Sequence, residues 1–469
     1  MLLVAAFILL QTLCGRFVDS SCVCCNDTLP VNILSQCIDA ATDYYIYGYS
    51  VVMSDITRRQ MVSNWTVNAF YNALAVPPAT WHTITAPNSD TLYSWAWLNL
   101  TTPILFEYPD VPDDRYFVFP IYDMFMDVVY SLGSRTTGNK KKLFLITGPN
   151  FDKISLGSDI IHLPMDTLYA LILGRTYFSG TAKDLKTVHK LQAKYTLKPV
   201  DVTTHTNVVY YEQPKINYTD NPKNEILKLT TIEYFDYLRN LLTFISRPRI
   251  EDNAFLNEIK ALLGDDYTQL NRKLIQLLEP LPLVVLEILK FETLKLYKGL
   301  NYWKSPTVIG NYGTNYMARA CIAAFGYASN INEDCVYCNA FKTSDFLELN
   351  GRHDYIIHFE NGLLPPVHAF WSITLYIPVD DGWYFYPNSM NKYDICVPRD
   401  ELVYNDDGSL DIYLQSKISN NSLVSNLIPT PFERNFILTM RLYWPNHSPP
   451  SILPITNSTW LPPYIKKIV

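Results

Sequence analysis

The sequence predicts an α+β protein in which two sheet-rich domains are joined by a helical connector. Short alternating apolar runs at 91–98, 104–108, 116–121 and 142–146 are punctuated by Gly, Pro and Asp, as in an antiparallel sheet. A second series at 355–359, 369–376, 410–415 and 436–443 predicts a β-sandwich. Between the two series, apolar residues recur at helical intervals from about 221 to 300.

The remaining elements follow from the same patterns. Apolar spacing predicts helices over 37–59, 182–195 and 315–325, and a buried strand over 167–177. A chain of 469 residues is too long for one ordinary core, so we expect several segments. These are a signal peptide at 1–20, an N-terminal α+β domain at 37–220, a helical connector at 221–300 and a C-terminal β-sandwich domain at 301–469.

The N-terminus indicates a secreted or surface-exposed protein. The first ten residues are almost entirely apolar, a length that suits a signal peptide and is short of the ~20 residues that span a bilayer. Val18 and Ser20 could occupy the −3 and −1 positions of a cleavage site. The alternative is an uncleaved signal anchor. No later stretch predicts a transmembrane span.

Cysteines and glycosylation sequons agree with an extracellular location. Cleavage would leave eight cysteines, an even number typical of disulfide-bonded proteins. Four of them follow the cleavage site closely, and bridges there could hold the N-terminus. The eight are Cys22, Cys24, Cys25, Cys37, Cys321, Cys335, Cys338 and Cys396. Sequons begin at Asn26, Asn64, Asn99, Asn217, Asn420, Asn446 and Asn457, which predicts a glycoprotein.

Composition excludes one class of function. The net charge is −7 and no broad basic face is present, so we expect no nucleic-acid partner. The chain has 34 tyrosines, which suit either sheet packing or a sugar-binding surface. Sheet packing is the more ordinary explanation.

Two long stretches resemble the signatures of a known pair of families. The first is Ala86-Pro-Asn-Ser-Asp-Thr-Leu-Tyr-Ser94, and the second is Leu364-Pro-Pro-Val-His-Ala-Phe-Trp-Ser-Ile-Thr-Leu-Tyr376. With smaller landmarks such as Gly133-Ser-Arg135 and Arg441-Leu-Tyr443, they make the chain similar to the domain of unknown function 1254, followed by the domain of unknown function 1214. The resemblance implies an α+β N-terminal domain and a jelly-roll-like C-terminal domain, and brings no established activity.

The first signature stretch is a candidate polar site. Asn88, Asp90, Thr91 and Tyr93 gather where a turn enters a strand, and Asp90 could act as a general base or a carboxylate ligand. The ordinary alternative is an Asx turn in which the side chains bind backbone N–H groups. Arg115 and Arg135 are candidates to pair with Asp90 or Asp123, or to bind an anionic substrate.

Other constellations carry weaker signals. His353 and His358 face opposite sides of one strand, and His358 with Glu360 alone leaves a metal site short of ligands, so we predict no metal. Cys335-Val-Tyr-Cys338 predicts a structural disulfide, internal or to Cys321. No nucleotide or nucleophile-elbow fingerprint is present, and we expect no cofactor. In the strand at 369–376, we expect Phe370, Ser372, Thr374 and Tyr376 on one face, and Trp371, Ile373 and Leu375 in the core.

Two hypotheses of different class remain. The first is an extracellular enzyme that acts on a polar polymer or glycoconjugate at the domain junction, with catalytic residues Asp90, Arg115 and Tyr122. Asn88, Thr91, Tyr93 and Arg135 would bind the ligand. The second is a non-catalytic binding or structural protein that uses the sandwich face. A deep cleft with an ionised Asp–Arg pair favours the enzyme, and a solid junction favours the second. The expected partner is a small molecule or a glycan. The sequence is also compatible with a homo-oligomer.

Overall fold

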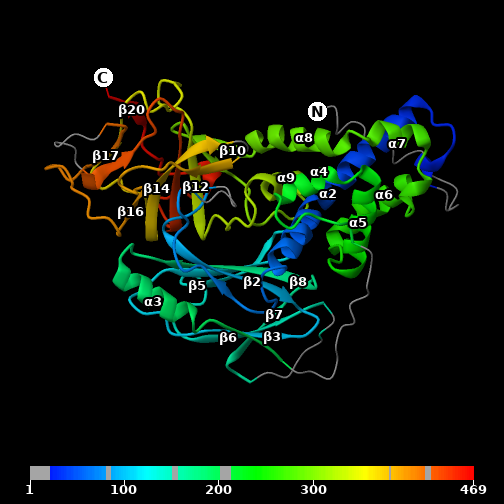
Figure 1. Ribbon diagram of the computed structural model, residues 1–469, viewed down its shortest axis with the longest axis horizontal. Helices are drawn as coiled ribbons and strands as arrows, with labels where there is room; N and C mark the ends of the chain where they lie inside the picture. Colours follow the sequence, from blue (N-terminus) through cyan, green and yellow to red (C-terminus); the bar gives the residue numbers. More distant parts are fainter. Residues whose placement is uncertain are drawn as a thin grey trace.

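The computed structural model describes residues 22–80, 86–149, 151, 157–200, 213–379, 382–417 and 424–468. It consists of three parts, namely an N-terminal β-sandwich, a group of helices and a C-terminal β-sandwich (Figure 1). This is the α+β architecture that the apolar patterns predict. The predicted signal peptide at 1–20 and the sequon at Asn420 lie outside the described residues.

The N-terminal sandwich consists of two sheets. The larger has the strand order β1 (Tyr71–Asn72), β2 (Thr91–Asn99), β8 (Tyr169–Tyr177), β4 (Phe117–Tyr122) and β5 (Val128–Gly133). The smaller has the order β7 (Ile160–Pro164), β6 (Lys142–Thr147), β3 (Ile104–Tyr108) and β9 (Thr196–Pro199). Neighbouring strands are antiparallel except β6 and β7. Phe106, Phe119 and Ile172 belong to the core that fills the space between the sheets. Helix α3 (Ala182–Gln192) begins at Thr181, whose side chain caps it.

The helices pack around one long helix, α2 (Val31–Val62). The others are α4 (Pro222–Lys228), α5 (Thr231–Phe244), α6 (Asn253–Leu263), α7 (Arg272–Leu278), α8 (Leu281–Lys295) and α9 (Tyr316–Phe325). Contact with α5 is close because Gly48 of α2 has no side chain. A Cβ atom there would lie 2.1 Å from a methyl group of Leu238. The predicted connector at 221–300 is therefore part of a larger helical group. That group also includes α2, which precedes the connector in the sequence, and α9, which follows it.

The C-terminal sandwich also has two sheets. The larger contains β10 (Tyr297–Leu300), β11 (Trp303–Pro306), β12 (Cys335–Ala340), β19 (Ile437–Pro445), β14 (Val367–Val379) and β15 (Gly382–Phe385), with β16 (Asp394–Val397) also paired to β14. The smaller contains β18 (Leu427–Pro429), β17 (Leu410–Gln415), β13 (Tyr355–Phe359) and β20 (Ile465–Lys467). Trp371, Ile373 and Leu375 lie in the core between them, as the alternation of the strand predicts.

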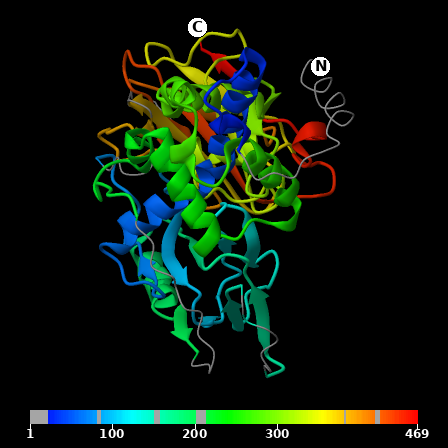
Figure 2. The same ribbon diagram turned by 90° about the vertical axis from the view of Figure 1, so that its right-hand side faces the viewer.

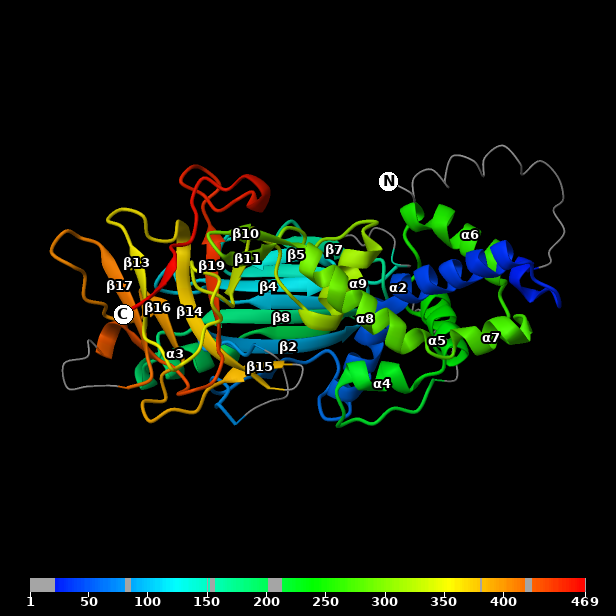
Figure 3. The same cartoon turned by 90° about the horizontal axis from the view of Figure 1, so that it is seen from above.

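The upper face of the larger N-terminal sheet carries the rest of the molecule. Figures 2 and 3 show the helical group and the C-terminal sandwich resting side by side on it. Trp97 and Leu173 contribute to the core shared with the helices, and Val118 to a small cluster with Phe370 and Tyr443 of the C-terminal sheet. The face of β14 opposite the sandwich core, which carries Phe370, therefore lies at the junction of the two sandwiches.

Cysteine pairing agrees with the sequence in one place and differs in another. Two disulfides, Cys22–Cys25 and Cys24–Cys37, join the four cysteines nearest the N-terminus. The prediction of a bridge at Cys335 was wrong, because Cys335, Cys338 and Cys321 are buried free thiols. Cys335 and Cys338 are three residues apart on β12, so their side chains lie on opposite faces of the sheet.

No helix in the described part of the chain is both long enough and apolar enough to cross a membrane.

Candidate functional site at the domain junction

The first signature stretch ends at the face of the C-terminal sheet. The hydroxyl of Tyr376 on β14 donates a hydrogen bond of 2.6 Å to the carbonyl of Pro87, and Arg441 on β19 donates one of 3.2 Å to that of Ala86. The Asn88 amide donates to the hydroxyl of Tyr443 over 2.6 Å. The two signatures, more than half the chain apart in sequence, thus bind each other.

Asp90 lies at the centre of this contact. Its side chain is fully buried, and Oδ2 accepts a hydrogen bond of 2.5 Å from Ser372 of β14. Its backbone N–H donates to Asn88 Oδ1 over 2.7 Å, which is the Asx turn that the sequence offered as the ordinary alternative. Oδ1 has no hydrogen-bond partner in the structure, and the nearest cation is Arg399, 3.7 Å away.

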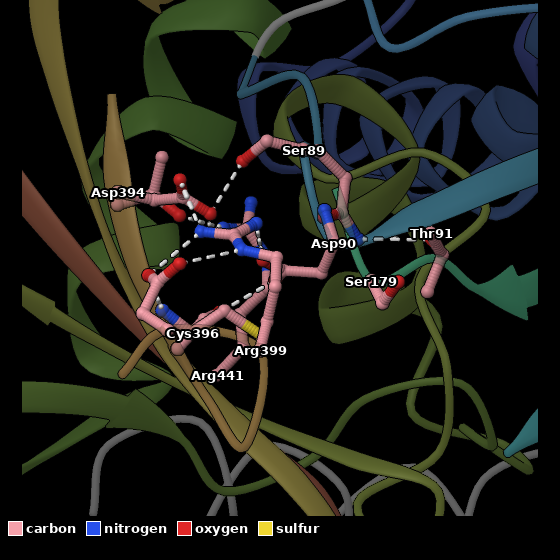
Figure 4. A network of polar contacts seen from close by, with 12 residues as sticks. Ser89, Asp90, Thr91, Ser179, Asp394, Cys396, Arg399 and Arg441 are labelled. Carbon is pink, nitrogen blue, oxygen red and sulfur yellow. Dashed lines mark hydrogen bonds and ion pairs between the residues drawn. The ribbon is translucent and has the colours of Figure 1, made fainter. Parts of the chain in front are cut away.

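Arg399 connects Asp90 to two further carboxylates. Its Nη2 atom donates to Asp394 over 2.8 Å and to Asp400 over 3.0 Å (Figure 4). Asp394 also accepts a hydrogen bond of 2.8 Å from Ser89 of the signature loop. We call Asn88, Ser89, Asp90, Ser372, Tyr376, Asp394, Arg399, Arg441 and Tyr443 the junction network. Because its members come from both sandwiches, it joins them.

The two carboxylates at the centre hold different charges. Burial, followed by the neighbouring Asp394 carboxylate, raises the pKa of Asp90 to about 7, although Arg399 and Arg441 oppose this. Burial also acts to raise the pKa of Asp394, but the attraction and hydrogen bond of Arg399 outweigh it and the pKa is lowered. Near neutral pH the negative charge therefore resides on Asp394, and Asp90 is protonated in a substantial fraction of the molecules.

Buried side chains surround the network. The Arg441 guanidinium donates to Thr374 and to Tyr376, and its carbon lies 5.7 Å from the centre of the Tyr376 ring. Burial raises the pKa of the Cys335 and Cys396 thiols, which keeps both neutral and unreactive at ordinary pH.

The other predicted catalytic residues have their own partners. The Arg115 guanidinium forms an ion pair with Asp184 of α3 and donates to the Tyr177 carbonyl over 2.7 Å. Tyr122 donates to the Ala328 carbonyl over 2.8 Å. Arg115 therefore joins helix α3 to the end of β8, and Tyr122 joins β4 to the segment after α9; neither side chain bonds Asp90.

Some of the predicted ligand-binding residues lie at the junction network, and others have partners elsewhere. Thr91 lies beside the junction network and accepts a hydrogen bond of 3.3 Å from the Asn88 amide. Arg175 lies over the ring of Tyr93, 5.5 Å from its centre. Arg135 pairs with Asp334 over 2.7 Å. The predicted pairing of Arg115 or Arg135 with Asp90 or Asp123 was therefore wrong, and Asp123 pairs with Arg249 instead over 2.7 Å.

The remaining candidates lie at the surface. His358 bonds Asp411 over 2.6 Å, and no group of three His, Cys, Asp or Glu side chains in the described ranges could hold a metal ion. Among the sequons, Asn26, Asn64, Asn217 and Asn457 are exposed, and Asn99 and Asn446 are half-buried. Glycosylation stays a prediction.

Of the nine residues in the junction network, the sequence predicted only Asn88 and Asp90 as site residues. Asp394 and Arg399 carried no recognisable motif, and their partners come from a loop about 300 positions away. Ser372 was visible only as a member of the second signature, and Arg441 only as part of a smaller family landmark. The alternation of β14, which placed Ser372 on the face opposite the core, was the one usable signal.

Comparisons with known proteins locate the chain among uncharacterised families. Residues 67–199 match the model of the protein of unknown function DUF1254, and residues 334–447 match that of DUF1214. No curated protein matches the chain. The crystal structure of the VPA0106 protein from Vibrio parahaemolyticus is similar in fold, with a TM-score of 0.68 and 21% identity over 92% of this chain and 100% of that one.

A putative uncharacterised protein from Burkholderia cenocepacia is more distant, with a TM-score of 0.43 and 10% identity over 93% of this chain and 96% of that one. The first signature stretch lies within the DUF1254 match and the second within the DUF1214 match. The chain therefore has the two-domain arrangement of the DUF1254 and DUF1214 families, in that order.

Proposed function

We propose that the protein is an extracellular, non-catalytic binding protein whose two sandwiches are locked together by the junction network. The observation that carries this proposal is the complete burial of Asp90 among side chains of both sandwiches. Two surface hollows, of about 320 Å³ beside His447 and about 480 Å³ along α8, do not include any residue of the network. A substrate could reach Asp90 only if the loop that carries it moved away from the C-terminal sheet.

An extracellular location is part of the proposal. The two disulfides near the N-terminus suit an oxidising compartment, where such bonds persist. Four sequons whose asparagines are exposed could accept glycans without disturbing the core. Both observations support secretion of the mature chain.

The contact surface that we favour is an exposed aromatic cluster on the C-terminal sandwich. The rings of Tyr302 and Phe346 lie 4.9 Å apart, and those of Tyr302 and Tyr464 lie 5.9 Å apart. All three side chains are exposed. Tyr302 and Phe346 have φ angles of 70° and 62°, which are unusual for bulky residues. Strained backbone that presents rings to solvent is typical of binding sites, and aromatic faces stack on the apolar faces of sugars.

A saccharide panel tests this proposal. The mature protein should show a rise in melting temperature with one class of saccharide, because a ligand of the native state stabilises it. Tyr302→Ala should abolish that rise. Tyr404→Ala removes another exposed tyrosine and is the matched control, and it should leave the rise intact. Binding that survives Tyr302→Ala but is lost in a folded Asp90→Asn variant would overturn the proposal.

One observation favours the enzyme hypothesis as a second candidate. Asp90 combines a pKa near neutrality with an Oδ1 atom that accepts no hydrogen bond, and groups with such a shifted pKa are frequent among general acids and bases. Hydrolysis of a glycoside or ester panel, lost in Asp90→Asn with the fold retained, would establish it. If wild type and variant are equally inactive on every member, binding stays the better account.

A further inference from the structure

Helix α8 is apolar on two sides but is covered on one. Leu281, Val285 and Leu289 are buried against the helical group. On the outer side, Leu283, Val284, Phe291 and Leu294 are between 47% and 64% exposed. A hollow of about 480 Å³ runs along this outer side. Figure 1 shows α8 along the upper edge of the helical group. A helix that is apolar all round is normally buried all round, and apolar patches on monomers mark interaction sites.

The outer side of α8 has the spacing of a helix–helix seam. Leu283, Glu287, Lys290 and Leu294 follow one another at intervals of four, three and four residues, which align along one side of a helix. Lys290 bonds Glu287 over 2.6 Å, and both side chains are largely exposed. The seam therefore has apolar ends and one pair of opposite charges at its centre.

The order of residues in this seam is self-complementary. If a second α8 lies antiparallel, with the two-fold axis between positions 288 and 289, each Leu283 faces Leu294 of the other copy. In the same register each Glu287 faces Lys290 of the other copy, and both pairs occur twice. Opposite charges in register and apolar pairs at the ends are what an isologous contact requires. We propose that α8 is a homodimer interface, in which two copies of the chain pair antiparallel along this seam.

A lipid surface fits the same side less well. Helices that lie on membranes keep their charges on the polar side and are rich in Lys and Arg there. Here Glu287 lies among the apolar residues, and the whole chain has a net charge of −7. Anionic lipid would repel both. A second copy instead places its Lys290 opposite Glu287, so that the carboxylate, which already bonds Lys290 of its own helix, gains a second ammonium partner on burial.

The size of the seam sets the strength of the expected dimer. A helix of 15 residues is about 22 Å long, so one helix pair gives an interface at the small end of the known range. We therefore expect a dimer that dissociates on dilution in the micromolar range. Sedimentation equilibrium of the mature protein over a dilution series should fit a monomer–dimer equilibrium.

Apolar substitutions test the location of the interface. Phe291 lies beside the seam, one helical turn after Glu287, and Phe291→Glu should weaken dimerisation at least about tenfold, because it would bring a further carboxylate to the edge of the contact. Ile250→Glu changes another exposed apolar residue, away from α8, and is the matched control, which should leave the equilibrium unchanged. Both residues are exposed, so the melting temperatures of both variants should match wild type.

A charge-swap cycle tests the register. Glu287→Lys and Lys290→Glu should each place like charges opposite one another and weaken the dimer about tenfold, and the double variant should restore it. A monomer at every concentration would overturn the proposal. A dimer whose dissociation constant is unchanged by Phe291→Glu would also overturn it, as would equal weakening by the single and double charge variants. A wild type that stays monomeric and binds anionic vesicles through Phe291 would overturn it as well.

Discussion

The junction network should give the protein a stability that falls as the pH rises towards neutrality. Asp90 has a pKa of about 7 in the folded chain and about 4 when unfolded, chiefly because burial disfavours its charged form. Between these values the folded state holds a proton that the unfolded state has lost. Each pH unit then lowers the free energy of unfolding by about 1.4 kcal/mol, and the loss ends as the pH passes the folded pKa.

Asp90→Asn should remove this contribution. The amide oxygen can still accept from Ser372, so we expect a cost of about 1 kcal/mol at pH 4.5, where Asp90 is neutral. From pH 4.5 to 7 the wild type should lose about 3 kcal/mol relative to the variant. Measurements start at pH 4.5 because Asp394, with its lowered pKa, contributes in the opposite sense below pH 4.

Urea unfolding curves of both proteins across this range measure the difference. The comparison cancels other groups, such as Asp123, whose pKa burial raises to about 6. Asp406→Asn, at an exposed position, is the matched control and should track the wild type at every pH. A difference between wild type and Asp90→Asn that stays constant from pH 4.5 to 7 would refute the reasoning, because Asp90 would then be ionised throughout.

Three further predictions concern how the parts are held together. Arg399→Met would leave Asp394 buried without its cation, and denaturant titration should find a loss of about 3–5 kcal/mol; a loss below 1 kcal/mol would mean that Asp394 is solvated. Gly48→Ala should cost about 1–3 kcal/mol, because its methyl group would overlap Leu238, whereas Gly299→Ala has open space and should be neutral; equal melting temperatures would show that α2 and α5 are less closely packed. Cys37→Ala removes the Cys24–Cys37 disulfide, whose cysteines are 13 positions apart, and should lower the free energy of unfolding by about 3 kcal/mol. A reductant should lower the melting temperature of the wild type more than that of the variant. Equal shifts in the two proteins would contradict the Cys24–Cys37 bridge.

Local patterns predicted the longest helices and strands and the two faces of β14, but not strands such as β5, β7 and β12. The predicted strand 355–359 coincides with β13 and 410–415 with β17, because alternation and turn residues determine where a half-buried strand begins and ends. The helical pattern of 221–300 also corresponds to helices. It could not indicate that these helices pack around α2, since that contact is set by tertiary fit at sites such as Gly48.

Only part of the candidate site could be predicted from the sequence. Asp90 was found because a polar turn before an apolar strand stands out locally. Arg399 was not found, because an ion pair between positions about 300 residues apart leaves no local pattern. Arg115 and Arg135 were identified as paired arginines, but their partners Asp184 and Asp334 were not, for the same reason. Sequence identified the side chains that need a partner, and only the fold selected which one each obtained.

Hydrogen–deuterium exchange across the junction tests the central claim most directly, namely that the two signatures form a closed contact. The Asp90 amide donates to Asn88 and the Phe178 amide donates to the Asp90 carbonyl over 3.0 Å, so peptides covering 86–94 should exchange as slowly as those from β19. Slow exchange that ends only with global unfolding is the result that the account predicts. Fast exchange at 86–91, with β2 and β19 still protected, would mean that the loop opens and exposes Asp90. That result would contradict a solid junction and return the enzyme hypothesis to first place.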